Sequence, residues 1–492
     1  MDDEADMDWS TGVGARRGVA SGAAPTLGVL RALVLATVAV GAGPQVGRAE
    51  NLSGALVKAY VNNPIINSSR AAVRAADENV PRANSGYLPS IQATGQLGVA
   101  HTNDNAIFPS TTGGPPSDIN FAVGYHPRGY GIQASQNIFD GYQTMNRIRS
   151  AESGVLESRA GLRLSEQSTL LDGVTAYMDV LRDTALLDLQ RNNVQVLQEQ
   201  LRETRDRFTV GEVTRTDVAQ AEASLSTAQA QELQAEATLE TSIAHYRQVI
   251  GDRPTSLAPV KPLTQPLPKT LEEAVRVSQI EYPQVVEDLH AVDMAELAVK
   301  VAEGALYPQV SLQGSIGQQF DVSATPGQRA FTASLLGNVT VPIYQGGQEY
   351  ATIRQNKEKL SQAELTLDQD RDAARRNVVQ FWGENQAQVG VIRAARASVS
   401  ANEVALAGVR EEAKVGQRTT LDVLNAQQAL LQARSNLVIA EHDAVVYSYS
   451  LLAAIGRLNA PTLNLAVDEY DPRQHFNQVK GKLWGVRTPD GK

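Results

Sequence analysis

The sequence contains two copies of one short motif, and each copy lies between long stretches of helical composition. The first copy runs from Thr209 to Ala221 and the second from Lys414 to Ala426. Val, Gly, Thr, Asp, Val and Ala recur at matching positions, about 205 residues apart. Gly suits the left-handed conformation that ends a helix, Thr is a good N-cap, and Asp is favoured in the first turn of the next helix. Each copy therefore predicts the tip of a long helical hairpin.

The segments around the two motifs repeat in the same order. Each repeat begins with a helix, continues with two alternating apolar–polar segments that predict strands, and ends with the hairpin. The strands are expected near residues 87–100, 130–140, 307–318 and 330–344. The predicted organisation is a signal peptide (1–49), a first structural repeat (50–251, tip 209–217), a proline-rich linker (252–269), a second repeat (270–456, tip 414–422) and an irregular C-terminal tail (457–492).

Two local features interrupt this pattern. Pro64 and Pro283 occupy matching places in the opening helix of each repeat and predict kinks. Residues 101–128, between the first two strands, are rich in Gly, Pro and Asn. They predict a surface loop, which is about 14 residues longer than its counterpart in the second repeat.

The N-terminus predicts a secreted protein. Arginines precede the apolar run 32–40, and Gly47 and Ala49 supply small residues for cleavage before Glu50. The alternative is a membrane anchor, but the run is shorter than the ~20 residues of a membrane-spanning helix. No other stretch is long and apolar enough to span as a helix, so a membrane span elsewhere is expected to be β.

Composition removes several classes of function. The 44 Lys+Arg against 54 Asp+Glu leave no basic patch for nucleic acid. The absence of Cys excludes disulfides and thiolate metal sites. The six His residues show no metal-ligand spacing, and no nucleophile–base pair, phosphate loop or cofactor motif is present. We therefore expect no cofactor and no enzyme.

The four predicted strands indicate a membrane and an oligomer. Each is about ten residues long with one apolar and one polar face, as in transmembrane β-strands. Strands of a soluble sandwich also alternate, but no second apolar layer accompanies these. Tyr87, Phe139, Tyr307 and Tyr344 lie where strands meet helices, as in an interfacial aromatic belt. Because open edges are not tolerated in lipid, four strands require further copies, and a trimer supplies twelve.

At this point the motifs and their order resemble the TolC-type outer-membrane efflux and secretion channels, the outer membrane efflux protein family. The resemblance covers nearly all of the mature chain and is strongest at Leu88-Pro89, at residues 341–347 and at both tips. It implies a mostly α fold with transmembrane β, in which a homotrimer forms a 12-stranded β-barrel in the outer membrane on a long periplasmic α-helical barrel. The implied function is the passive exit duct of a tripartite efflux or type I secretion system.

The resemblance also implies partners and a docking surface. A periplasmic adaptor, driven by an inner-membrane pump or ABC transporter, would open the duct at its helical tips. The residues matched to the family's docking surface are Val210, Gly211, Thr214, Val415, Gly416 and Thr419.

The family's resting pore is narrowed by aspartates on the inner hairpin, which corresponds here to the second tip. Asp422 matches the first of these aspartates, and Asn425 stands where the archetype has another. One ring of carboxylates is then expected per trimer. The simpler interpretation of Asp422 is a first-turn carboxylate that stabilises a helix N-terminus, and both roles are compatible.

A latch between the two hairpins is implied as well. Gln200, Thr216 and Asp217 match one side of it, and Arg418 matches the other. Ala413 replaces the archetype's latch tyrosine, so a looser or differently built latch is expected. The simpler alternatives are a helix-capping Asp217 and a solvated Arg418.

A second class of function is a non-pore periplasmic protein, either a structural coiled coil or the adaptor itself. The four amphipathic strands disfavour the coiled coil. Two tandem hairpins disfavour the adaptor, which would have one hairpin flanked by β-rich domains.

Overall fold

A computed structural model describes residues 49–108, 113–114, 117–322 and 327–491. The predicted signal peptide therefore lies outside the described residues except for Ala49. The first repeat contains α1 (Leu52–Asn62), α2 (Pro64–Asp77), α3 (Asn79–Asn84), a 3-10 turn η1 (Ser85–Tyr87), β1 (Ser90–Leu97), β2 (Ala100–Phe108), β3 (Ser117–Tyr125), β4 (Arg128–Phe139), α4 (Gln143–Thr209) and α5 (Arg215–Ile250). The second contains α6 (Leu271–Glu281), α7 (Pro283–Gly304), β5 (Gln309–Phe320), β6 (Arg329–Thr340), α8 (Gln348–Lys414) and α9 (Thr420–Ala454), followed by α10 (Pro472–Val479).

Both predicted proline kinks are complete breaks. Pro64 and Pro283 each occupy the first position of a new helix, where the missing N–H removes no hydrogen bond. The Asn63 side chain accepts a hydrogen bond from Ile65 N at 2.8 Å and so caps α2. The chain thereby replaces one long helix with two shorter ones in each repeat: α1 and α2 follow α4, and α6 and α7 follow α8.

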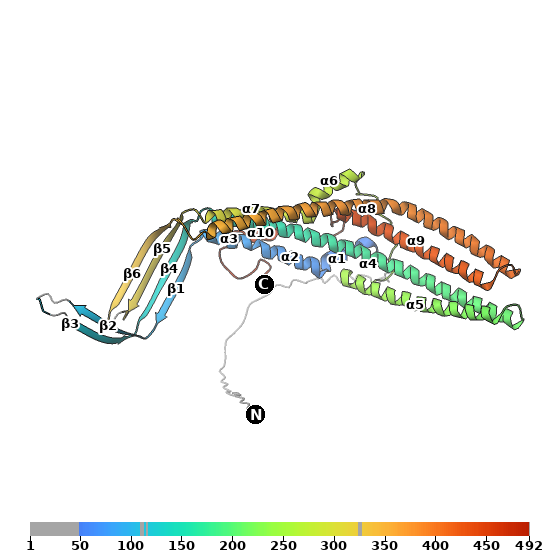
Figure 1. Ribbon diagram of the computed structural model, residues 1–492, viewed down its shortest axis with the longest axis horizontal. Helices are drawn as coiled ribbons and strands as arrows, with labels where there is room; N and C mark the ends of the chain where they lie inside the picture. Colours follow the sequence, from blue (N-terminus) through green and yellow to red (C-terminus); the bar gives the residue numbers. More distant parts are fainter. Residues whose placement is uncertain (1–48, 109–112, 115–116, 323–326, 492) are drawn as a thin grey trace, which may run out of the picture. The chain divides into compact units, whose positions relative to one another are not determined.

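The long helices α4 and α8 each have 67 residues, which corresponds to ~100 Å. Figure 1 shows α4 paired with α5 and α8 paired with α9, each pair ending in a tip. The helix α4 also packs against α7 and α9, so it joins the two repeats. The largest core cluster lies among these helices and includes the fully buried Leu170, Tyr177, Tyr246 and Leu452. Among the residues that the structure describes, no helix has both the length and the apolar character needed to cross a membrane.

The linker between the repeats packs against this core. Leu257, Val260 and Leu263 contact the cluster, and the Tyr177 hydroxyl lies 2.7 Å from the carbonyl oxygens of Glu50 and Ala258. The extended linker is thus held in place, although it forms no helix of its own.

The four predicted strands form one antiparallel sheet in the order β1-β4-β5-β6. Residues paired across antiparallel strands share a face, so the register separates two surfaces. One face carries Ile91, Tyr130, Ile132, Leu312, Ile316, Phe331 and Leu335. The other carries Gln92, Thr94, Gln96, Gln133, Ser315, Gln319 and Thr332. The predicted alternation is therefore confirmed, and all of the large apolar side chains named here are exposed.

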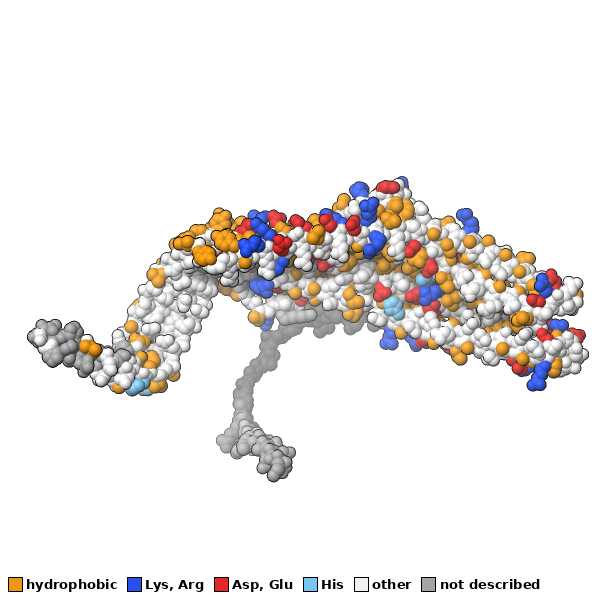
Figure 2. Space-filling model, viewed as in Figure 1, with side chains coloured by type: hydrophobic (Ala, Val, Ile, Leu, Met, Phe, Trp, Pro, Cys, Tyr) orange, Lys and Arg blue, Asp and Glu red, His pale blue; other side chains and the backbone are white. Residues whose placement is uncertain are grey.

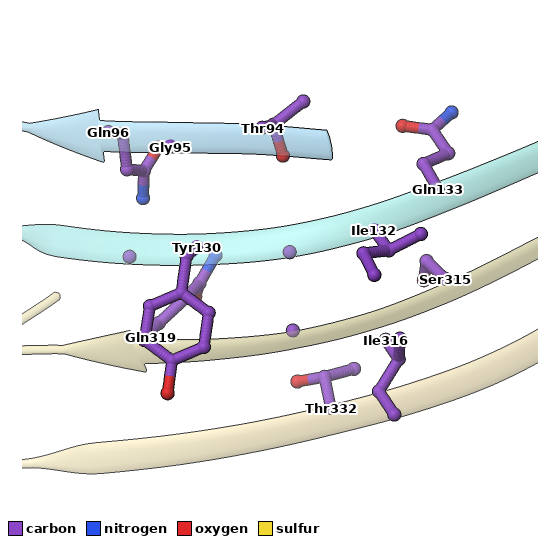
Figure 3. A pocket seen from close by; sticks show the side chains of 13 residues that line it. Thr94, Gly95, Gln96, Tyr130, Ile132, Gln133, Ser315, Ile316, Gln319 and Thr332 are labelled. Atoms are coloured by element: carbon purple, nitrogen blue, oxygen red, sulfur yellow. The ribbon is translucent and has the colours of Figure 1, made fainter. Parts of the chain in front are cut away.

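The polar face is hollow. A cavity of ≈ 330 Å³ lies over Thr94, Gln96, Gln133, Gln319 and Thr332, whose side chains Figure 3 shows around it. Glycines form part of its floor: a Cβ on Gly131 would lie 3.0 Å from the Ile316 carbonyl oxygen. The only charged residues in the four strands are Arg128 and Arg329, and both belong to the apolar face.

The prediction of a loop at residues 101–128 was wrong. This segment forms β2 and β3, an antiparallel pair in register from Ala100↔Tyr125 to Phe108↔Ser117. Asn, Asp and Gly give these strands weak β propensity. The backbone N–H and C=O groups of the two strands nevertheless pair with each other, and amino-acid composition does not reveal such pairing.

The prediction of a wholly irregular tail was also wrong. Helix α10 packs on α2, and His475 Nδ1 lies 2.9 Å from Asp77 Oδ2, with both residues buried. Arg159 lies 3.7 Å from the other oxygen of Asp77. These partners are far apart in sequence, so no local pattern indicated the helix.

Candidate functional site

The two helical tips have nearly the same backbone. Gly211 and Gly416 have φ of +81° and +76°, in the left-handed region that glycine favours. The preceding Val210 and Val415 are 71% and 70% exposed. A Cβ on either glycine would meet nothing within 4 Å. Each tip therefore presents an open, apolar point that no other described part of the chain covers.

Each tip continues into a capping box. Thr214 N and Oγ1 lie 2.8 and 2.7 Å from Asp217 Oδ2, and Asp217 N donates to Thr214 Oγ1 at 3.3 Å. In the second tip Thr419 N and Oγ1 both lie 2.9 Å from Asp422 Oδ2, and Asp422 N donates to Thr419 Oγ1 at 3.2 Å. The two reciprocal hydrogen bonds fix the start of α5 and of α9.

These bonds also keep both aspartates ionised. The hydroxyl of Thr214, followed by its N–H, lowers the pKa of Asp217. The N–H of Thr419, followed by its hydroxyl, lowers the pKa of Asp422, and Arg418 adds to the shift. The capping role suggested for both residues by their positions is therefore present. It is compatible with a further role for the Asp422 charge.

Asn425 lies one turn beyond Asp422 on α9. It is exposed and lines a hollow of ≈ 260 Å³, together with Leu197 of α4 and Thr227 of α5. The two residues predicted at the constriction are therefore neighbours on α9.

The four predicted latch residues are not joined within the described chain. Arg418 Nε donates to Glu412 Oε2 at 2.9 Å, within its own tip. Arg207 and Glu212 form a different ion pair at 3.1 Å across the first tip, in which Arg207 occupies the position of Glu412. Thr216 is exposed, and no hydrogen bond connects Arg418 to Gln200, Thr216 or Asp217 among the described residues. The latch therefore remains a prediction.

Gln200 instead lies in a groove between the hairpins. The groove has a volume of ≈ 630 Å³ and is bounded by α4 on one side and by α8 and α9 on the other. Ala413, at the position of the missing tyrosine, lines the same groove. Figure 2 shows charged side chains gathered at both tips, near the ends of these helices.

A partly buried network that we did not predict joins the hairpins further along the helices. His442 of α9 lies 3.0 Å from Asp179 of α4 through Nε2 and 2.8 Å from Asp443 through Nδ1. Arg182 contacts Asp179 at 2.7 Å, and Asp183 accepts from Ser242 of α5 at 2.5 Å. The network therefore connects α4, α5 and α9. Of its members, only Asp179, Arg182 and Asp183 lie close enough in the sequence for their spacing to predict contact on one helix.

The charge of His442 is expected to strengthen this connection. Burial lowers the pKa of His442, but the carboxylates of Asp179 and Asp443 outweigh it and raise the pKa above the usual value, despite the nearby Arg182. Protonated His442 therefore stabilises the fold. This contribution is complete below the unfolded pKa of ~6.5, and it is lost as pH rises through the folded pKa of His442.

We therefore expect the melting temperature to fall as pH is raised from about 6 through the folded pKa of His442. His442→Gln should flatten this dependence in thermal melts recorded across the same pH range. His245→Gln is the matched control, because the 3.3 Å pair of His245 with Asp172 is solvent-exposed. An unchanged pH profile in His442→Gln would contradict the assignment.

Comparisons with known proteins agree with this architecture. The sequence matches the profile of the outer membrane efflux protein family over residues 55–252 and 277–457. It is 42% identical over 448 residues to the outer membrane efflux protein BepC of Brucella suis, covering 91% of this chain and 94% of the relative. It is 26% identical over 445 residues to the outer membrane protein TolC of Escherichia coli, covering 85% and 84%. The fold matches the crystal structure of the Campylobacter jejuni CmeC outer membrane channel with a TM-score of 0.73 and 17% identity, covering 88% and 89%.

Proposed function

The chain belongs to the outer membrane efflux protein family, and from that membership we propose that it is the passive exit duct of a tripartite efflux or type I secretion system. Its relatives are outer-membrane channels rather than enzymes. Gating at the helical tips by a periplasmic adaptor, itself driven by an inner-membrane pump or ABC transporter, completes the proposal. The observation that carries it is the two-faced sheet with two open edges.

The sheet supports assembly into a trimer. Strands β1 and β6 lie at its edges and pair on one side only among the described strands. Unpaired edges are not tolerated in lipid, so each edge requires a partner. Because β1 and β6 run in opposite directions, β6 of one copy can pair antiparallel with β1 of the next copy. Three copies then close a cylinder of twelve strands, with the polar hollow inside and the apolar face toward lipid.

Aromatic side chains support the membrane boundary. Phe139 and Tyr142 stack edge-on at 5.2 Å, and Tyr142 lies 6.4 Å from Tyr307. Tyr307 and Tyr344 are 51% and 78% exposed where the strands meet the helices. Amphipathic rings favour the lipid–water interface, so this junction would lie at the periplasmic surface of the membrane.

The tips support docking. Val210, Gly211 and Thr214, with Val415, Gly416 and Thr419, form two equivalent turns at the ends of the hairpins. The exposed valines offer apolar contacts, and the left-handed glycines allow a partner helix to approach the backbone closely. An adaptor with helical hairpins of its own matches this surface.

The gate would act through the second hairpin. In a trimer, Asp422 and Asn425 of three copies would narrow the pore, and the three carboxylates would attract cations. The latch would form between copies, where Arg418 exchanges Glu412 for Gln200, Thr216 or Asp217 of the neighbour. Adaptor binding at the tips would then bias the closed–open equilibrium.

Conductance in planar bilayers tests the duct and its gate together. Wild-type protein should form channels that a multivalent cation blocks from the periplasmic side. Asp422→Asn keeps a capping oxygen but removes the charge, so block should weaken roughly fivefold or more. Asp217→Asn is the matched control, since it makes the same change in the other capping box. Equal cation block of wild type and Asp422→Asn would contradict the role proposed for Asp422. The absence of channels would contradict the proposed function.

A further inference from the structure

The apolar face of the sheet ends in a row that contains two arginines. Leu97, Arg128, Phe320 and Arg329 pair in register across all four strands, so their side chains share this face. The guanidinium carbon of Arg128 lies 5.5 Å from the centre of the Phe320 ring, and that of Arg329 lies 5.9 Å from it. Phe320 therefore holds both cations beside one ring, in the cation–π range.

This row lies at the margin of the apolar surface that is distant from the helices. Strands β4 and β6 begin at Arg128 and Arg329, and β5 ends at Phe320. The next row inward carries Tyr130 and Phe331, each 65% exposed. Rows of Ile, Leu and Ala follow. The order from the margin inward is thus charge, aromatic and aliphatic, which matches the order of head group, interface and hydrocarbon in a leaflet.

The charge of the row is only partly neutralised. Arg128 lies 3.6 Å from Asp321, and its side chain remains 60% exposed. Asp321 also accepts a hydrogen bond from Gly327 N at 2.9 Å. Arg329 is exposed and forms no ion pair with any carboxylate of the described residues. One positive charge is therefore in excess, beside apolar surface rather than beside the polar hollow.

We propose that Arg128 and Arg329 bind the phosphorylated head group of a lipid in the leaflet that faces away from the cell. This inference rests on the proposed function, which puts the helices in the periplasm and the apolar face in lipid. Guanidinium groups match phosphate with planar, paired N–H donors, and Phe320 orients them in advance. The acyl chains would lie along Ile132, Ile316 and Leu335, so charge and apolar contact select the same ligand.

Native mass spectrometry of the full-length protein in neutral detergent tests the site. The probes are diphosphorylated lipid A, the same lipid after removal of both phosphates, and inorganic phosphate. Wild type should bind the phosphorylated lipid about 30-fold more tightly than the dephosphorylated one, from roughly fivefold for each arginine near a membrane surface. Equal binding of the two lipids by wild type would overturn the proposal without the need for any variant.

Variants then locate the site. Arg128→Gln/Arg329→Gln should bind both lipids equally, whereas Arg375→Gln/Arg376→Gln makes the same charge change on exposed positions of α8 and should retain the preference. Unchanged preference in the first pair, or displacement of the lipid by equimolar inorganic phosphate, would overturn the proposal. The first pair should still conduct like wild type in planar bilayers. If the wild-type protein conducts but shows no preference for the phosphorylated lipid, only the lipid site is contradicted. If the wild-type protein does not conduct, the proposed duct is contradicted.

Discussion

Replacing Gly211 and Gly416 together by leucine is expected to abolish export while leaving the protein assembled in the outer membrane. Both glycines have left-handed φ, which costs a residue with a Cβ roughly 1–2 kcal/mol at each position. The space around each tip is open, so leucine would not disturb the interior of the chain. It would instead project into the surface proposed for the adaptor. Export is measured as sensitivity to toxic small molecules and as the amount of protein secreted.

Two further variants separate docking from backbone strain. Asparagine at both positions tolerates the left-handed conformation, so Gly211→Asn/Gly416→Asn should retain more export than the leucine pair. Gly408→Leu adds the same bulk to an exposed helical position of α8 with no atoms nearby, and should leave export unchanged. Normal export by the leucine pair would show that the tips do not carry the docking surface.

Gly141→Ala is expected to destabilise the fold by roughly 3 kcal/mol or more, one of the largest effects of a single methyl group in this chain. Gly141 has φ of +68° at the turn from β4 into α4, and an added Cβ would overlap the Gly304 carbonyl oxygen and lie 2.8 Å from Tyr307 Cβ. Gly304 is also crowded, since its own Cβ would lie 2.6 Å from the Gly141 carbonyl oxygen. Because backbone atoms of both segments lie at the contact, the structure cannot easily relax around the added methyl group. Thermal unfolding and the yield of protein in outer membranes measure the effect.

The second repeat supplies the control. Gly346 occupies the equivalent turn with φ of +69°, but a Cβ there would meet nothing within 4 Å. Gly346→Ala should therefore cost only the ~1–2 kcal/mol of the backbone conformation. Equal losses in the two variants would show that the close approach of Gly141 and Gly304 has no energetic weight.

The sequence predicted what depends on local periodicity or on the comparison of one repeat with the other. Alternation along residues 90–97 and 309–320 indicated the two faces. Gly416, Thr419 and Asp422 indicated the turn, the N-cap and the first-turn carboxylate, and the structure adds the reciprocal hydrogen bond from Asp422 back to Thr419. The register of β1, β4, β5 and β6 then confirmed that the large apolar residues share one side, with Leu336 of β6 as an exception on the polar face.

The parts that escaped prediction depend on partners distant in the chain. The strands β2 and β3 stabilise each other through backbone pairing, which the weak β propensity of their residues does not predict. His475 contacts Asp77, and His442 contacts Asp179, although hundreds of residues separate the partners in the sequence. The latch differs in kind: Arg418 has a local partner in Glu412, and no hydrogen bond joins it to its predicted partners among the described residues.

The neutral polar face of the sheet has a consequence for what the duct can carry. Its amides and hydroxyls both donate and accept hydrogen bonds, so the wall would solvate anions, cations and uncharged molecules much as a liquid amide does. A wall of this kind sorts by width rather than by charge. The four strands would then add no sieving by charge, and cargo that reaches them would meet no electrostatic barrier along this face.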